Sequence, residues 1–498
     1  MGEPSASGSS GLARQLGLTG LAATGICSML GAAINTIPFV IQRNVPGIGP
    51  YVLLAFLFAA VPAILAAMAY AILGSAMPRA GGSYVYASRS LNPYLGFVAS
   101  FSQWFGLSIA IGVVSYVLII FLRDIATALS FPELASTLES GPVRVTLALA
   151  FLWLFVGINL RGLRLYERTL VPMMFVMFAL GAIVIVAGFY FDTNDFSAAL
   201  LAREGRVISE LEAPPLQWNT FLAAAAILFS SFIGFDSIAQ AGGEARRPSR
   251  SIPLAIGIAI ATVGTFYFLF TAAMYHAVPW SYIAEEAMTR DLTAPGLLGY
   301  LLSPGWTVAI VVGAAIALAN DLPAMLLGVS RLMFAWAEDG IFPKRVGRVH
   351  RTFHTPYVAI IASGAMASVG IIGCQLAGDF FLGVDILVTS MLVNFLLMCV
   401  SVLLLPRRNP ALASEVKVFR SRKIQIPLAG AGALLLTLFL VVHVRKDLAA
   451  DVEAWYFHST PIWLLVMTVA TIIFMREMRS LKASGVDVDA RFSSLPPE

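Results

Sequence analysis

Long apolar runs separated by short polar loops dominate the chain. Twelve of these runs are long enough to cross a hydrocarbon core of ~30 Å at ~1.5 Å per helical residue. Because a helix satisfies its own backbone hydrogen bonds in lipid, the pattern predicts an all-α polytopic membrane protein with 12 transmembrane helices. The runs lie roughly at 18–41, 48–74, 94–129, 142–160, 168–191, 216–241, 252–278, 305–336, 356–377, 380–406, 424–444 and 455–475.

Two of the twelve runs contain residues that interrupt a helix. The first run holds Ser28, Gly31, Asn35 and Pro38, which are poor choices for an uninterrupted helix. The sixth run, five helices later, repeats the pattern in "FSSFIGFDS", residues 229–237. Interrupted spans at matching positions of two five-helix halves are typical of an inverted-repeat transporter. The alternative is that small residues here only let helices pack closely.

A helix broken within the membrane has a direct chemical consequence. The break frees backbone N–H and C=O groups, which is tolerable only where they line a cavity. Half-helix N-termini then attract an anionic group, and freed carbonyls attract a cationic one. A zwitterion such as an amino acid fits both, so we expect a small-molecule ligand of this kind.

Composition and charge agree with a membrane protein and suggest its orientation. Of the 498 residues 58% are hydrophobic and only 12% are charged, so lipid is the expected surroundings. With twelve spans, 24 of the 32 Lys and Arg residues fall on the side that holds both termini. The positive-inside rule therefore predicts cytoplasmic termini in a plasma (inner) membrane. Because the basic residues are spread over short loops, we expect no nucleic-acid partner.

Candidate catalytic and metal-binding groups are few. Cys27, Cys374 and Cys399 all fall inside spans and show no metal-ligand or disulfide spacing. His350 and His354 stand four residues apart in a basic loop, where a solvated or phosphate-facing patch is the simpler interpretation. No nucleophile–base set and no phosphate-binding loop is visible. We therefore expect no catalytic residues, no metal and no cofactor, and a protein that is not an enzyme.

Several motifs resemble those of one transporter superfamily. "AMPRAGGSYVYASRSLNPYLGFVASFSQW" is similar to the signature after span 2, and "FIGFDSIAQAGGEARRPSRSIP" to that of span 6. "LGAAI" in span 1, "NLRGLRLYERT" before span 5 and "SRLMFAWAEDGIFPKRVGRVHRTFHTP" after span 8 add three more in the same order. On these motifs the chain resembles an amino acid permease of the amino acid–polyamine–organocation superfamily.

The resemblance implies an architecture. It consists of a 5+5 inverted-repeat core with broken helices 1 and 6, plus two C-terminal helices, working by alternating access. The expected divisions are an N-terminal cytoplasmic tail (1–17), the core (18–406), a basic loop (407–423), helices 11 and 12 (424–475) and a C-terminal cytoplasmic tail (476–498). Within the core, the two repeats would be 18–191 and 216–406.

The resemblance also implies a substrate site between spans 1, 3, 6, 8 and 10. The substrate carboxylate would meet backbone N–H groups around Gly31, Ala32 and Ala33. Its amino group would meet freed carbonyls of Met29, Ser230 and Ile233. Span 3 from Gln103 onwards, together with span 10, would line the side-chain pocket.

Some residues depart from the family pattern at this site. Ala33 replaces a usual Gly, Asn35 stands where an apolar residue is common, and Ser230 replaces a common Phe or Trp. The smaller Ser230 indicates either a roomier pocket or a gate formed by Phe229 or Phe232 instead.

The coupling ion is the least determined feature, and proton or sodium coupling and exchange all stay open. Met177 stands where some relatives have a Lys, and Asn320 aligns with a sodium-binding Ser or Thr of others. Asp321 is a coupling candidate, because a carboxylate at mid-membrane costs ~2.5–3.5 kcal/mol unless it is paired, hydrated or protonated. The alternative is a solvated or hydrogen-bonded Asp321. Asp236 is a weaker candidate that would cap the broken helix.

The predicted function is therefore secondary active transport of amino acids. Two alternatives remain, a polyamine or organic-cation transporter and a membrane sensor that binds an amino acid without moving it. On the cytoplasmic side, Arg79, Arg246 and Arg247 are expected to hold a gate by pairing with Glu244 or Asp339. Membrane lipid is the other expected partner, and the sequence does not determine the oligomeric state or any accessory subunit.

Overall fold

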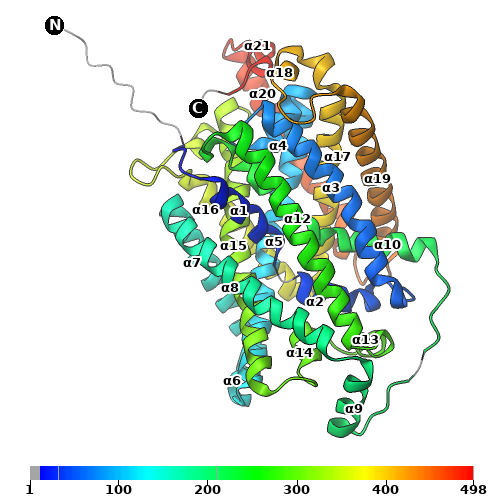
Figure 1. Ribbon diagram of the computed structural model, residues 1–498. Helices are drawn as coiled ribbons and strands as arrows, with labels where there is room; N and C mark the ends of the chain where they lie inside the picture. The colour runs from blue at the N-terminus through cyan, green and yellow to red at the C-terminus, as the bar shows by residue number, and fades with distance from the viewer. Residues whose placement is uncertain (1–11, 32, 210, 379, 497–498) are drawn as a thin grey trace.

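A computed structural model describes residues 12–496 except 32, 210 and 379, and these form a long helical bundle (Figure 1). Within the described residues, eleven segments are long and apolar enough to cross a membrane. The twelfth predicted span contains only a shorter apolar helix, Trp218–Phe232, because the chain unwinds in its middle. The prediction of a polytopic all-α membrane protein is confirmed.

Ten of the spans are continuous helices. Five of them begin and end within three residues of the predicted limits. The second, fifth, seventh and twelfth spans begin four or five residues from the predicted start, and the last two end five and eight residues later. These helices are α3 (Val52–Ala76), α5 (Pro93–Ala128), α7 (Gly141–Leu160), α8 (Leu163–Tyr190), α12 (Pro248–Ala277), α15 (Pro304–Asp339), α16 (Tyr357–Ala377), α17 (Phe381–Arg408), α19 (Arg422–Ala449) and α20 (Ser459–Ala483).

The other two spans are interrupted. The first consists of α1 (Leu18–Met29) and α2 (Ala33–Asn44). The sixth consists of α10 (Trp218–Leu228), the 3-10 turn η2 (Phe229–Phe232) and α11 (Asp236–Gln240).

Several short helices and 3-10 turns were not predicted, because they are too short to cross a membrane and some have polar sequences that resemble loops. They are α4 (Gly82–Ser90), α6 (Pro132–Glu139), α9 (Thr193–Glu204), α13 (Trp280–Ala287), α14 (Ala294–Leu298), α18 (Pro410–Ser414) and α21 (Val488–Ser493), with 3-10 turns η1 (Gly49–Tyr51), η3 (Gly242–Glu244), η4 (Lys344–Gly347) and η5 (Trp455–Phe457).

Local sequence explains where many helices begin. Pro93 and Pro304 stand in the first turn of the two longest helices, where a missing N–H costs nothing. The Asn92 side chain caps α5 by accepting the Leu95 N–H at 2.8 Å. Both helices are largely buried and pack against each other, so α5 and α15 form the centre of the bundle.

The two ends of the bundle differ in charge. One end, at the top of Figure 1, carries α4, α18 and α21. The basic stretches 246–250, 344–351 and 407–423 belong to this end, which we call the basic end. The described start of the chain also lies here, because Leu16 pairs with Glu244 and Arg246 through backbone hydrogen bonds of 2.9 and 2.8 Å. Helices α6, α9 and α13 lie at the opposite end.

Candidate functional site

The break in the first span follows Met29, where the chain leaves the helix. Leu30 has φ −94° and ψ 65°, and regular helix resumes with Ala33. The freed carbonyl of Met29 accepts a hydrogen bond from the Tyr267 hydroxyl of α12. A Cβ atom on Gly31 would collide with the Asp321 carboxylate, so glycine allows α15 to approach the unwound backbone.

The break in the sixth span lies directly against the first. Ile233 is extended, and Gly234 has φ +135°, a conformation that other residues rarely adopt. A Cβ atom on Gly234 would also collide with the carbonyl group of Ser28. The Ser28 and Ser237 hydroxyl oxygens are 3.0 Å apart and hydrogen-bonded. The two interrupted spans therefore meet at their breaks.

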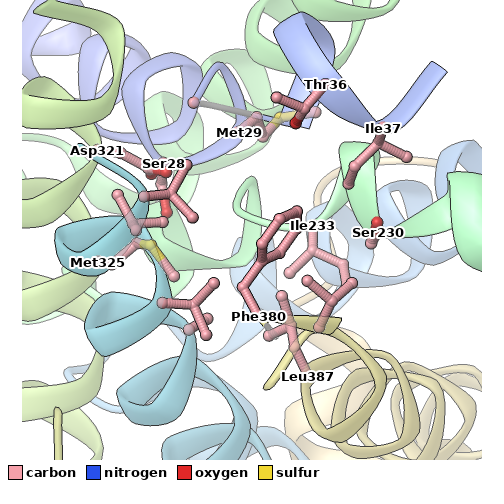
Figure 2. A pocket seen from close by; sticks show the side chains of 16 residues that line it. Ser28, Met29, Thr36, Ile37, Ser230, Ile233, Asp321, Met325, Phe380 and Leu387 are labelled. Carbon is pink, nitrogen blue, oxygen red and sulfur yellow. The ribbon is translucent and has the colours of Figure 1, made fainter. Parts of the chain in front are cut away.

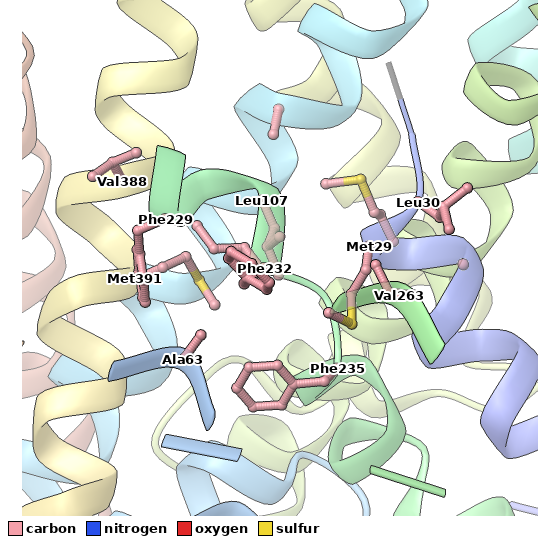
Figure 3. Packing of buried hydrophobic residues seen from close by; sticks show 14 of the residues in the cluster. Met29, Leu30, Ala63, Leu107, Phe229, Phe232, Phe235, Val263, Val388 and Met391 are labelled. Atoms are coloured by element: carbon pink, nitrogen blue, oxygen red, sulfur yellow. The ribbon is translucent and has the colours of Figure 1, made fainter. Parts of the chain in front are cut away.

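Aromatic side chains pack around the second break. Phe229, Phe232 and Phe235 gather there, with Met391 beside Phe229 (Figure 3). Phe232 contacts Phe56 at a ring distance of 5.1 Å, and all three phenylalanines are buried. These rings pack against Phe56 of α3 and Phe395 of α17, and none of them lines the cavity described next.

A cavity lies where the two breaks meet (Figure 2). Its residues come from both broken spans and from α5, α15 and α17. Asp321 and Ser28 lie side by side on one wall, while Phe380 and Leu387 lie across from them. The lining is formed by Ser28, Met29, Gly31, Thr36, Ile37, Ala110, Val113, Val114, Val117, Ser230, Ile233, Asp321, Met325, Phe380, Val384 and Leu387.

The wall of this cavity is polar in one part and apolar in most of the rest. Asp321 is its one charged side chain among the described residues, and its Oδ1 has no hydrogen-bond partner there. The Ser230 hydroxyl is likewise buried without a partner. Buried polar groups are normally satisfied, so these atoms indicate a site that a ligand or water completes.

Most of the residues expected at the substrate site lie at this cavity. Met29, Gly31, Ser230 and Ile233 line it. Ala32 lies outside the described residues, and of Ala33 only its place as the first residue of α2 is described.

The three residues that were candidates for ion coupling do not all lie at the cavity. Asp321 lines the cavity, but Asn320 and Asp236 do not. The Asn320 amide donates to the Cys27 sulfur at 3.1 Å and to the Leu170 carbonyl at 3.2 Å.

Asp236 binds the unwound chain rather than the first turn of a helix. Its Oδ1 accepts the Gly234 N–H at 3.1 Å, and its Oδ2 accepts a hydrogen bond from the Gln103 amide. Phe235 holds the N-cap position of α11. Asp236 is thus not the N-cap residue of α11, but its carboxylate accepts a backbone N–H at the break, which is the kind of contact that was predicted for it.

A buried hydrogen-bond chain continues from Asp236 through four helices. Gln240 donates to the Gln103 side chain at 3.2 Å and to the Ser83 hydroxyl at 2.7 Å. The Ser83 hydroxyl is 2.6 Å from that of Tyr70, which accepts from Asn394 at 2.7 Å. Gln103 therefore holds the break in place and does not begin the cavity wall.

The sequence predicted that span 3 after Gln103 and span 10 would line the side-chain pocket, but not which of their residues face the cavity. Ala110, Val113, Val114 and Val117 form one face of α5 at spacings of three and four residues. Because α5 is apolar on all sides, its hydrophobic pattern does not distinguish this face from the others. Phe380 was missed as well, since it stands just before α17 among other apolar residues.

Two buried ion pairs close the basic end, and they differ from the predicted gate. Arg331 binds Glu244 with two hydrogen bonds of 2.9 and 2.6 Å. Arg89 binds both oxygens of Asp339, one of them at 2.9 Å. Glu244 and Asp339 were predicted as the acids of these pairs. The prediction that Arg79, Arg246 and Arg247 are their basic partners is wrong. Arg331 and Arg89 face inward from helices, whereas the predicted bases stand in the loops.

The C-terminal segment covers one of these ion pairs. The Phe492 ring lies 4.9 Å from the Arg89 guanidinium carbon, and the Arg89 Nε donates to the Ser494 carbonyl at 3.0 Å. Arg79 donates to the Pro496 carbonyl at 3.1 Å, and Arg491 donates to that of Glu338 at 2.9 Å. Helix α21 and residues 494–496 are thus part of the closure.

In the basic loop, the His350 ring has a local structural role. The His350 ring nitrogen accepts the N–H groups of Thr352 and Phe353, both at 3.2 Å. Across the described residues, no group of three His, Cys, Asp or Glu side chains is placed to hold a metal ion.

Comparison with known proteins identifies the family. The amino acid permease family model matches residues 16–472. The branched-chain amino acid permease BcaP of Bacillus subtilis is 24% identical over 488 residues, covering 95% of this chain and 96% of its own. Cationic amino acid transporter 4 of Mus musculus is 27% identical over 84% of this chain and 65% of its own. The low-affinity putrescine importer PlaP of Escherichia coli K12 is 26% identical over 68% of this chain and 69% of its own.

The family-model match covers nearly the whole helical bundle, including both interrupted spans. The family and the relatives are permeases and transporters, so the expectation that the chain is not an enzyme is confirmed. The chain is an integral, multi-pass membrane protein that belongs to the amino acid permease family.

Proposed function

We propose that the protein is a secondary active transporter that moves amino acids with apolar side chains by alternating access. The observation that carries this proposal is the cavity at the meeting point of the two helix breaks. It combines unwound backbone and one carboxylate with a mostly apolar wall. Such a site suits a small zwitterion with a hydrophobic side chain.

The polar part of the cavity suits the backbone of an amino acid. The Asp321 carboxylate would bind the substrate ammonium group, which would supply the partner that its Oδ1 lacks. Backbone N–H groups around Gly31 would bind the substrate carboxylate, as the family resemblance implies. The Met29 carbonyl already accepts from Tyr267, so it is a weaker ammonium partner than the resemblance suggested.

The apolar part of the cavity favours aliphatic side chains over charged ones. Val113, Val117, Val384 and Leu387 face this space together with Phe380. A second positive charge on the substrate would stand against these side chains without a partner, which is costly. The name of the Bacillus relative, a branched-chain amino acid permease, agrees with this choice. Putrescine lacks a carboxylate and carries two such charges.

For coupling, we propose that protons act through Asp321. A proton and the substrate ammonium would compete for the same carboxylate, so ligand binding would depend on pH. The basic end would face the cytoplasm and the protein would lie in the plasma membrane, by the positive-inside rule.

The test is uptake by proteoliposomes of the purified protein, supplied in turn with leucine, isoleucine, valine, arginine and putrescine. Each substrate would be measured with and without sodium and with a pH gradient of either sign. We expect sodium-independent uptake of the aliphatic amino acids. Uptake of putrescine alone would favour an amine transporter, and saturable binding without uptake or counterflow would favour a sensor. Either outcome contradicts the proposal.

A further inference from the structure

A groove on the outside of the bundle, far from the central cavity, has no role in the transport proposal. It lies between α3 and α12 and holds about 640 Å³, within the ~300–1,000 Å³ of small-molecule sites. Residues 417–419, which precede α19, form its third wall. Its apolar residues Ile64 and Leu254 are 44% and 48% exposed, as expected for side chains that face lipid.

The groove ends at the basic end of the bundle beneath two cations. Arg250 stands in the first turn of α12, and Lys417 lies across from it. No acidic side chain is among the described residues that line the groove. The groove therefore joins a positive end to an apolar floor.

The wall that carries Lys417 is held in place by hydrogen bonds. The Lys417 backbone N–H donates to the Ser75 hydroxyl at 3.0 Å, and its ammonium donates to the Ser249 hydroxyl at 3.1 Å. The Phe419 carbonyl accepts from the Gln425 amide at 2.9 Å, and Phe419 keeps a positive φ of 49°. The ring of Phe419 lines the groove while remaining 39% exposed.

The length of the groove matches one leaflet of a membrane. From Arg250 to Ile260 the lining follows α12 for ten residues, or ~15 Å at ~1.5 Å per residue. Half of a ~30 Å hydrocarbon core has the same depth. An acyl chain lying in the groove would thus reach mid-membrane while its phosphate stays beside the two cations.

We propose that this groove binds an anionic phospholipid, with its headgroup phosphate between Arg250 and Lys417 and an acyl chain along α3 and α12. Basic pockets between helices at the cytoplasmic side of membrane proteins recognise such headgroups. The lipid would join α3 and α12 to the segment that leads into α19. This site is independent of the transported substrate.

The test is to titrate delipidated protein in detergent with phosphatidylglycerol or phosphatidylcholine. At each lipid concentration, intrinsic fluorescence measures the midpoint of thermal unfolding. A lipid that binds the folded protein raises this midpoint. We expect phosphatidylglycerol to raise it more than phosphatidylcholine does. The double variant Arg250→Gln/Lys417→Gln should bind phosphatidylglycerol about 30-fold more weakly, at ~1 kcal/mol for each basic residue.

Two further variants test whether the lipid effect depends on this groove or on the positive charge of the whole basic end. Lys344→Gln/Arg345→Gln removes two exposed cations from the same end and should leave the lipid effect unchanged. Gly257→Leu fills the groove, because a Cβ atom there meets nothing within 4 Å, and should weaken binding while the protein stays folded. Equal effects of the two lipids, or equal losses in both double variants, would overturn the proposal. Full binding by Gly257→Leu would also overturn it, and so would stabilisation of the same size by inorganic phosphate alone.

Discussion

The central cavity and the basic end both hold buried carboxylates, but only those of the basic end have every oxygen hydrogen-bonded. At the basic end both oxygens of Glu244 and both oxygens of Asp339 accept hydrogen bonds from arginine. In the cavity, Asp321 Oδ1 and the Ser230 hydroxyl have no partner among the described residues. The structure is thus closed at its basic end and incomplete at its centre.

This difference indicates what each region is for. A complete set of buried ion pairs stabilises one conformation, and opening that end would require breaking them. Polar atoms without partners in a cavity have no such stabilising effect. Their desolvation is costly until a ligand or a water molecule binds to them. For the transporter proposed above, we expect the first to act as a gate and the second as the binding site.

The largest effect is expected from breaking the gate. Arg331→Ala would leave Glu244 buried without its partner, which costs ~3–5 kcal/mol for pairs of this kind. We expect a large fall in the thermal midpoint in detergent, partly restored by the apolar double variant Arg331→Met/Glu244→Leu. Arg123→Ala removes a partly exposed pair with Asp124, worth ~0–1 kcal/mol, and serves as the matched control. Equal falls in Arg331→Ala and Arg123→Ala would refute the role of the buried pair.

The next effect concerns the incomplete centre. Asp321→Asn would replace a charge-assisted hydrogen bond to the substrate ammonium, at a cost of ~1.5–3 kcal/mol. We expect about 10- to 100-fold weaker amino acid binding. The pH dependence of binding should be lost as well, because the competing proton no longer has its site. Scintillation proximity binding at several pH values measures both, and an unchanged pH profile would remove Asp321 from coupling.

The contact between the two breaks should be almost as sensitive. Gly234→Ala would force an alanine to φ +135° and place its Cβ against the Ser28 carbonyl, at ~1–3 kcal/mol for the backbone strain. We expect a lower thermal midpoint and slow uptake. Gly257→Ala, on an exposed position of α12, should instead stabilise by ~0.5–1 kcal/mol. If both glycine variants behave alike, the breaks do not depend on this contact.

The smallest effect is expected from the C-terminal segment. Deleting residues 488–498 removes the carbonyl and the ring that contact Arg89 but leaves its ion pair with Asp339. A hydrogen bond from a charged guanidinium contributes ~1.5–3 kcal/mol. Because Arg89 keeps its ion pair, we expect a loss at the lower end of this range, so the basic end should open about 10-fold more often. Thiol labelling of Ser88→Cys, which lies beside this pair, would report the opening. Labelling at an unchanged rate would mean that the segment plays no part in closure.

Much of the fold could be predicted from the sequence, for a physical reason. In lipid, every backbone group must find a partner within a helix, so apolar length alone locates the spans. The interruptions at Gly31 and Gly234 were also visible, because small and polar residues are conspicuous in an apolar run. The short helices α4 and α9 were not visible, since their polar sequences resemble loops.

The site could be predicted only in part. Asp321 and Ser230 were found because a polar residue at mid-membrane needs an explanation. Val117 and Leu387 were not found, since one apolar residue among many carries no sign of the surface it faces. The partners of Glu244 and Asp339 depend on tertiary packing, which brings Arg331 and Arg89 to them from other helices.

The measurement that tests the central claim most directly is equilibrium binding of labelled isoleucine to purified Val117→Trp. The indole would fill the cavity at the helix breaks, whereas Val186→Trp adds the same side chain on the outer face of α8, where Val186 is 69% exposed. With both variants folded, we predict that Val186→Trp binds as the unmodified protein does and Val117→Trp does not bind. Unchanged binding by Val117→Trp would contradict a substrate site between the two breaks.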